Sequence, residues 1–128
     1  MLTVEQAIKK AERLLPGGPA PEGHNDPRWQ AIVAVAEFIE SDTDEVWTFA
    51  LRWGRHRNKD LRTAIATCLL EHLLAYDFDR IFPRVEAATK KSRRFADTFC
   101  LCWAFDQTQE PANARRFNRL KRTCRLVE

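Results

Sequence analysis

Long apolar segments are missing from this chain of 128 residues, which nowhere holds the run of about 18 hydrophobic residues that a membrane span needs. The first 15 residues mix acidic and basic side chains into their apolar pattern, so we expect neither a signal peptide nor a membrane anchor there. The composition, with 45% hydrophobic and 30% charged residues, is typical of a globular domain. These features predict a single cytoplasmic domain without a membrane partner.

Cysteine and histidine are few, with four and three residues, and their spacing argues against a metal centre. Cys100 and Cys102 would point about 200° apart on a helix, so they would not ligate the same ion. All four cysteines fall within helical patterns rather than in a loop-rich framework, which favours reduced, buried thiols over disulfides. No catalytic motif is present, and we therefore expect a non-enzymatic protein with no catalytic residues, no metal and no cofactor.

Apolar residues recur at helical spacing along most of the chain and predict about seven helices. The first is capped by Thr3 and Gln6, and the third by a capping box of Asp42 and Glu45. Pro83 is expected in the first turn of a helix that Asp79 caps. The predicted segments are a leading helix within residues 1–15, a Pro- and Gly-rich connector at 16–25, repeated helices at 26–105, of which the last spans 93–105, and a basic terminal helix at 111–127.

The chain also repeats itself, because residues 25–40 align with residues 59–74 at an offset of 34. This alignment matches Asp26 with Asp60, Arg28 with Arg62 and Glu37 with Glu71. A helical repeat of this length indicates helix pairs that stack and bury a shared core. We expect each arginine to bind carboxylates or carbonyl groups in the neighbouring unit, because a lone buried guanidinium would be costly.

These segments resemble HEAT-type repeats. The resemblance is carried by Asp26-Pro27-Arg28 followed by the small apolar residues 31–36, and by Asp60-Leu61-Arg62 followed by residues 64–68. It covers about residues 25–105 and implies an all-α, right-handed α-solenoid that acts as a binding scaffold. The chain also resembles, more faintly, small bacterial immunity proteins of secreted toxins, which implies a bacterial protein that blocks a cognate toxin by occluding its active site.

Charge is distributed unevenly: residues 1–50 carry −5 and residues 51–128 carry +8. The acidic half concentrates carboxylates around one helix–helix turn, where they form either a solvated capping turn or a patch for a basic protein surface, such as the cleft of a nuclease-like toxin. A tryptophan beside them lies off its apolar stripe and is expected to be partly exposed, whereas the other three tryptophans are expected in the core. The predicted partner-binding residues are Glu37, Glu40, Asp42, Asp44, Glu45 and Trp47.

Arginines in the basic half support two alternative functions, although a merely solvated face fits the same residues. A continuous positive strip would bind the phosphates of nucleic acid. A HEAT-like DNA glycosylase would use an exposed tryptophan with an aspartate and an arginine, for which Trp103, Asp97 and Arg94 are the candidates. The predicted nucleic-acid-binding residues are Arg52, Arg55, Arg57, Arg115, Arg119 and Arg122.

Overall fold

The computed structural model describes residues 2–16 and 26–126, which form seven helices and no strand. Most of the predicted connector, residues 17–25, lies outside the described residues, as does residue 127 at the end of the predicted terminal helix. The expected all-α class and helix number are confirmed. The helices are α1 (Val4–Leu14), α2 (Pro27–Ala36), α3 (Thr43–Gly54), α4 (Lys59–Ile65) continuing through a π-helical turn (Ala66–Leu70) into α5 (Glu71–Tyr76), α6 (Phe78–Lys91), α7 (Arg93–Cys100) and α8 (Pro111–Leu126), with a 3₁₀ turn at Asp106–Gln109.

Polar caps fix most of the helix starts. The backbone N–H of Thr3 donates to the Gln6 side chain at 2.9 Å and the N–H of Gln6 donates to the Thr3 hydroxyl at 3.2 Å, so the predicted capping box is confirmed. Ser92 accepts from the Phe95 N–H at 3.1 Å. The capping box predicted for α3 is wrong, because the Asp42 carboxylate makes no cap bond and instead accepts from the Ser41 hydroxyl at 2.8 Å.

Two boundaries differ from the prediction. Helix α6 begins at Phe78, one residue before Asp79, and holds the exposed Pro83 in its second turn, where the ring faces away from the core. Helix α7 ends at Cys100 instead of continuing to residue 105. The apolar residues 101–105 have a helical spacing, but the chain does not continue as a helix there, because the Trp103 N–H binds Glu71 and the Cys102 carbonyl binds Lys121 of other helices.

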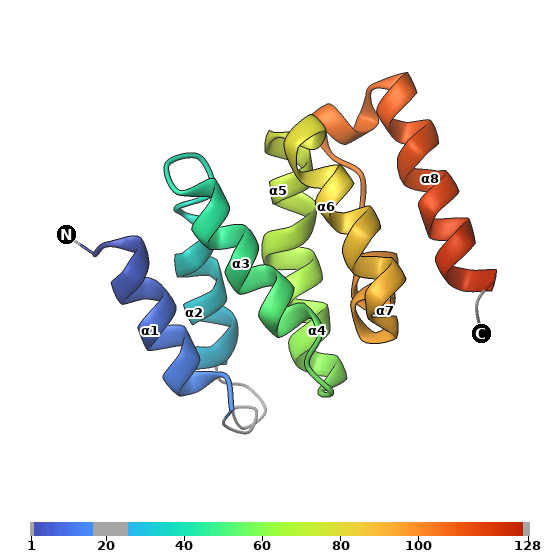
Figure 1. Ribbon diagram of the computed structural model, residues 1–128. Coiled ribbons are helices and arrows are strands. Elements are labelled where there is room, and N and C mark those ends of the chain that lie inside the picture. The colour runs from blue at the N-terminus through green and yellow to red at the C-terminus, as the bar shows by residue number, and fades with distance from the viewer. Residues whose placement is uncertain (1, 17–25, 127–128) are drawn as a thin grey trace.

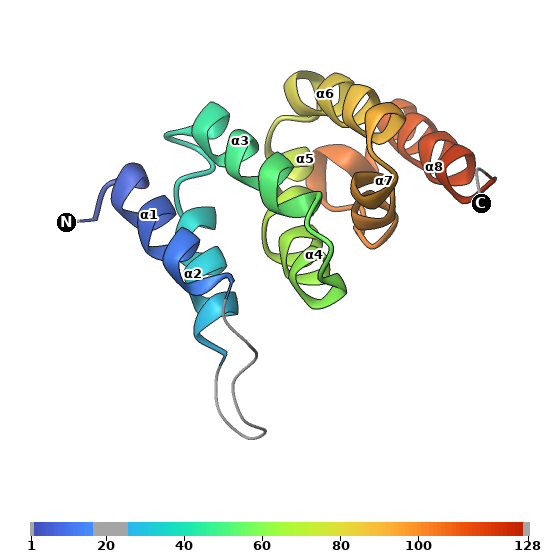
Figure 2. The same cartoon turned by 60° about the horizontal axis from the view of Figure 1, so that its bottom comes forward.

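The helices lie in two layers along one direction (Figures 1 and 2). Helices α1, α3, α6 and α8 form one layer, and α2, the continuous α4–α5 helix and α7 form the other. Each short connection reverses the chain, so successive turns alternate between two opposite edges of the molecule. Buried residues from Val4 in α1 to Cys124 in α8 form one continuous hydrophobic cluster between the layers.

The two similar segments lie side by side, since α2 packs against α4 and the π-helical turn. Their structural register differs from the sequence alignment. The N-cap residues of α2, α4 and α7 are Asp26, Asn58 and Ser92, spaced 32 and 34 residues apart, so Arg28 is level with Asp60 and not with Arg62.

This register explains how the buried Arg28 is neutralised. Its guanidinium is 3% exposed and binds Asp26 at 3.0 Å and Asp60 at 2.6 Å. The hydrogen bond that Arg28 donates to Asp26 raises the pKa of Arg28, and this effect exceeds the opposing effect of burial. Arg62 donates to the carbonyl groups of His56 and Arg57, both at 2.9 Å. The expectation is met by Arg28, which binds a carboxylate of α4, whereas Arg62 binds the turn that precedes its own helix rather than the neighbouring unit.

We predict that Arg28→Ala lowers the free energy of unfolding by about 2 to 3 kcal/mol, because it removes a desolvated ion pair and leaves a cavity, while water rehydrates Asp60. Glu86→Ala, which breaks an exposed 3.9 Å pair with Arg116, provides the control and should cost no more than about 1 kcal/mol. Urea denaturation of both variants measures the difference. Equal effects of the two substitutions would show that Arg28 does not connect α2 to α4.

Candidate partner-binding surface

Acidic residues gather at the edge where α2 and α5 end and α3, α6 and α8 begin, at the top of Figure 1. We call this set the acidic edge. It contains the five carboxylates predicted to bind a partner and four more that come from the later turns: Glu37, Glu40, Asp42, Asp44, Glu45, Asp77, Asp79, Asp106 and Glu110.

Only part of the predicted site borders a hollow. Glu37 and Glu40 line a depression of about 620 Å³ together with His72 and Tyr76 of α5 and with Asp106. None of the three carboxylates forms an ion pair with another described residue. The depression therefore presents uncompensated negative charge beside an aromatic side chain.

The remaining predicted residues have other surroundings. Asp44 binds Arg80 at 2.8 Å and Arg84 at 2.9 Å, and the hydrogen bond from Arg84 lowers the pKa of this carboxyl. The expected exposure of Trp47 is wrong: the side chain is 8% exposed, and its ring packs edge-on against Phe95 of α7 at 5.9 Å. It lies on the side of α3 that faces α7 and not on a free surface.

The tryptophan that is exposed is Trp103, with 71% of its surface accessible, so its predicted core position is wrong. Residues 102–105 belong to no helix, and the backbone of Phe105 is extended. Cys102 is buried while Trp103 and Phe105 face solvent. The two-residue spacing of Trp103 and Phe105 was the signal in the sequence that could have indicated their exposure.

Contacts from two other helices hold this segment in place. The backbone N–H of Trp103 donates to the Glu71 carboxylate at 3.1 Å, and the Lys121 ammonium donates to the carbonyl group of Cys102. Phe105 stacks on His72 with ring centres 5.9 Å apart and 9° between the planes. Asp106, with a φ of 44°, then turns the chain into the 3₁₀ turn.

These contacts create a surface that we call the aromatic face. It comprises an exposed residue of α2, two residues of α5 and two of the segment before α8, and its His72 and Tyr76 line the acidic depression. Four of its members are 39% to 71% exposed, and the fifth is the stacking partner of Phe105: Val33, His72, Tyr76, Trp103 and Phe105.

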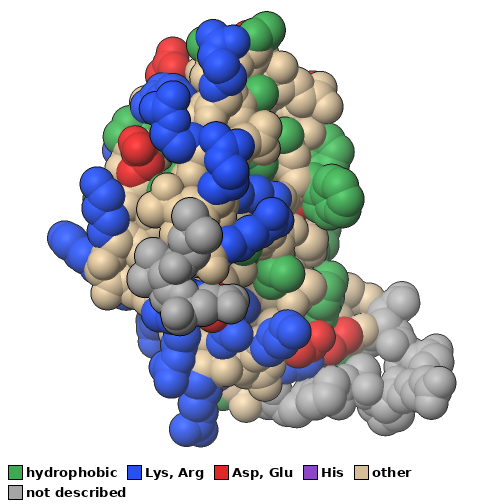
Figure 3. Space-filling view, turned by 90° about the vertical axis from the view of Figure 1, so that its right-hand side faces the viewer, with side chains coloured by type: hydrophobic (Ala, Val, Ile, Leu, Met, Phe, Trp, Pro, Cys, Tyr) green, Lys and Arg blue, Asp and Glu red, His purple; other side chains and the backbone are tan. Residues whose placement is uncertain are grey.

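The residues predicted for nucleic acid fall into two groups. Arg52, Arg55 and Arg57 line a hollow of about 360 Å³ with Arg94 of α7. Arg52 also binds Glu12 and lies over the Trp53 ring at 5.2 Å. The other three, Arg115, Arg119 and Arg122, are exposed along α8, where Figure 3 shows lysine and arginine side chains across that end of the molecule.

The three glycosylase candidates do not meet in one hollow. Trp103 lines a depression with Phe117 and Lys121 of α8, whereas Arg94 lines the hollow beside α3. Asp97 accepts from Arg93 at 3.3 Å, one turn earlier on its own helix. The structure therefore does not assemble this set.

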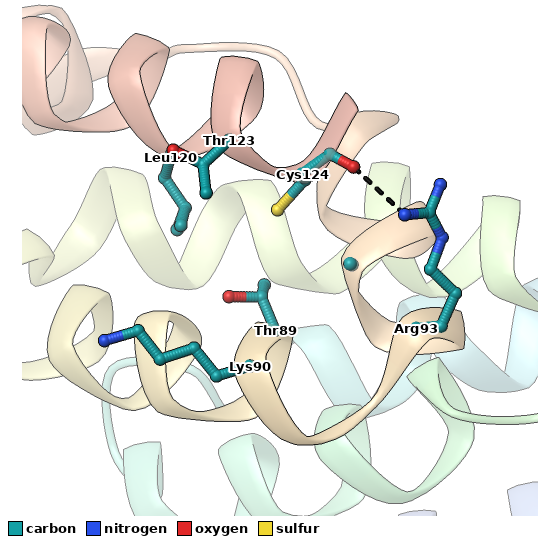
Figure 4. Close-up of a pocket in the computed structure, with 7 residues that line it drawn as sticks. Thr89, Lys90, Arg93, Leu120, Thr123 and Cys124 are labelled. Atoms are coloured by element: carbon teal, nitrogen blue, oxygen red, sulfur yellow. Dashed lines mark hydrogen bonds between the residues drawn. The ribbon is translucent and has the colours of Figure 1, made fainter. Parts of the chain in front are cut away.

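A further hollow of about 340 Å³ lies where α6, α7 and the end of α8 meet (Figure 4). Lys90 and Arg93 form its polar side, and Leu120 and Cys124 its apolar side. Arg93 donates to the carbonyl group of Cys124 at 3.2 Å, which fixes the end of α8 to the start of α7. Burial raises the pKa of the Cys124 thiol, so this hollow does not favour a thiolate.

Among residues 2–16 and 26–126, no group of three or more metal-binding side chains is close enough to hold an ion. No helix in that part of the chain combines the length and apolar character needed to cross a bilayer. Comparisons of the chain with protein-family models, curated proteins and solved structures gave no match. Function must therefore be argued from these surfaces.

Burial raises the pKa of Glu71, and the bond from Trp103 offsets this only in part. The folded state therefore keeps the Glu71 carboxyl protonated to a higher pH than the unfolded state does. The stability that this group contributes is fully present below its ordinary pKa of 4.5 and is lost as pH rises through the raised pKa. We predict that Glu71→Gln gains stability relative to the wild type as pH rises through this window.

Parallel urea denaturation series of the two proteins at several pH values measure this trend. Glu71→Ala is the matched control, since it leaves the buried Trp103 N–H without an acceptor and should lose about 1 to 3 kcal/mol even at neutral pH. Wild type and Glu71→Gln stability curves that run parallel with pH would contradict the raised pKa.

Proposed function

We propose that this chain is a non-enzymatic protein-binding module built as a HEAT-like, right-handed α-solenoid. Three features support this architecture: packing within the pairs α1–α2, α3–α4 and α6–α7, packing of α2 on α4 and of α4 on α7, and the recurring N-caps at the starts of α2, α4 and α7. Scaffolds of stacked helix pairs use extended surfaces for binding rather than enclosed active sites.

The observation that carries the proposal is the aromatic face. A small domain gains nothing for its own stability by exposing 71% of a tryptophan, and Phe105 and Tyr76 are exposed beside it by 41% and 39%. Tryptophan and tyrosine are enriched among the residues that dominate binding energy at protein interfaces. Contacts to Glu71, Lys121 and His72 hold Trp103 and Phe105 in position, so little ordering entropy is lost on binding.

The charge next to the aromatic face indicates the chemistry of the partner. Glu37, Glu40 and Asp106 add uncompensated negative charge beside its His72 and Tyr76, which complements a surface that combines basic and apolar groups. The hollow at Trp103 is lined instead by cations of α8, so the acidic contacts belong to the His72 side of the face. In the most concrete version, the partner is a secreted, nuclease-like toxin and this chain is its immunity protein in the bacterial cytoplasm. The module then covers the basic substrate cleft and inhibits by occlusion.

The structure changes the residues that we assign to this interface. Glu37 and Glu40 remain, and Asp42 and Glu45 extend the acidic rim. Asp44 is already bound to Arg80 and Arg84, and the buried Trp47 is replaced as the apolar anchor by Trp103 and Phe105.

We predict that Trp103→Ala weakens binding of the native partner by about 2 kcal/mol, or roughly 30-fold in Kd, and that Glu37→Lys with Glu40→Lys slows association. Tagged wild-type protein captures the partner, and titration of the purified pair compares the variants. Leu2→Ala, which truncates an exposed apolar residue outside the aromatic face, and Glu86→Lys, which reverses an acidic residue of α6 outside the acidic edge, should leave the Kd unchanged.

A partner whose affinity is indifferent to Trp103 and to both glutamates would refute the aromatic face as its docking site. For the immunity version, the captured protein must have a hydrolytic activity that added wild-type protein suppresses and that Trp103→Ala suppresses less. Capture of a partner without such activity would still support a protein-binding module but would exclude the immunity role.

A further inference from the structure

The edge opposite the acidic edge carries a second surface, which the proposed protein-binding function does not use. At this edge α3 and α6 end, α4 and α7 begin, and α8 ends, at the bottom of Figure 1. We call its exposed cations the basic edge: Arg55, Arg57, Lys59, Lys90, Lys91, Arg94, Arg122 and Arg125.

These cations are available for a ligand. None of the eight forms an ion pair with a described residue. The carboxylates nearby, Asp60 and Asp97, are bound by Arg28 and Arg93. The positive charge at this edge is therefore not neutralised within the described part of the chain.

The basic edge is continuous across three structural elements. Arg55 and Arg94 line the same hollow beside His56, and Arg55 with Lys91 lines a neighbouring hollow of about 340 Å³. The bond from Arg93 to the Cys124 carbonyl then places the end of α8 against the start of α7. Burial lowers the pKa of His56, and the nearby charges of Arg57 and Arg94 lower it further, as expected where positive charge is concentrated.

We propose that the basic edge binds the phosphodiester backbone of nucleic acid. A row of cations that spans two turns and a helix end matches a linear polyanion better than a compact acidic patch. Five large apolar side chains are exposed in the described residues: Leu2, Val33, Tyr76, Trp103 and Phe105. None of them lines the two hollows at the α3–α4 and α6–α7 turns, whereas Trp103 lines a hollow with Arg122 and Arg125 of α8. The two turns thus lack the apolar anchors that a protein interface or an inserted membrane helix would use.

We expect binding through this edge to be independent of base sequence, because its hollows present guanidinium and ammonium groups at turns, which hold phosphates. Affinity should consequently follow the number of phosphates contacted and fall steeply with salt.

Fluorescence anisotropy with labelled oligonucleotides tests this proposal. With a duplex of about 20 base pairs and a single strand of similar length, we expect micromolar binding at about 50 mM salt and at least a tenfold loss at about 200 mM. Anionic phospholipid vesicles serve as the alternative polyanion.

Two variants with equal change in charge decide whether the edge itself binds. The first replaces Arg55, Arg57, Lys91 and Arg94 with Glu, and the second replaces Lys9, Lys10, Arg115 and Arg119 with Glu. The first should lose at least tenfold more affinity than the second, with circular dichroism showing that both are folded. Equal losses, no binding at low salt, or tighter binding to the vesicles than to either oligonucleotide would overturn the proposal.

Discussion

The constraint on which this structure depends is the reversal of the chain between successive helices. Short connections join α2 to α3, α3 to α4, α5 to α6 and α6 to α7, so these helices alternate in direction and every second turn returns to the same edge. Acidic residues gather at the turns of one edge and basic residues at those of the other, which separates charge across the width of the molecule. The two proposed binding surfaces follow from this alternation.

Within that frame, the buried ion cluster sets the register between neighbouring helix pairs. Arg28 donates hydrogen bonds to the N-cap aspartate of its own helix and to Asp60 at the start of α4. Trp29 adds a 3.4 Å bond from its indole N–H to the Asp60 carboxylate. Because a buried guanidinium tolerates few alternatives, this cluster discriminates against other alignments of α2 on α4. Thr98 joins α7 to α3 in a similar way, donating to the carbonyl group of Gly54 at 2.6 Å, where a Cβ would lie only 3.1 Å from the Phe95 ring.

Helical periodicity, capping residues and the internal similarity were sufficient to predict the class of fold, the number of helices and the role of Arg28. The same signals failed at Trp47 and Trp103, which exchanged their expected environments. Periodicity assigns a face within one helix, but it does not say which neighbour covers that face, and α7 covers Trp47. It also extended α7 too far, because the bonds from Trp103 to Glu71 and from Lys121 to Cys102 join residues distant in the sequence. The acidic and basic edges depend on how the turns alternate between the two sides of the molecule, so the sequence alone predicted only part of each edge.

The π-helical turn at residues 66–70 distinguishes the continuous α4–α5 helix from the similar helix α2. Such a turn holds one residue more than an α-helical turn, and that residue rotates everything after it by about 100° about the helix axis. Glu71 follows directly and faces the interior, where it anchors the exposed segment, whereas its counterpart Glu37 faces solvent on the rim of the depression. Counted from the N-caps Asp26 and Asn58, Glu71 lies two residues further along its helix than Glu37, and the π-helical turn accounts for one of the two. The two glutamates that the sequence aligns therefore differ in role, one as an internal anchor and the other exposed for recognition.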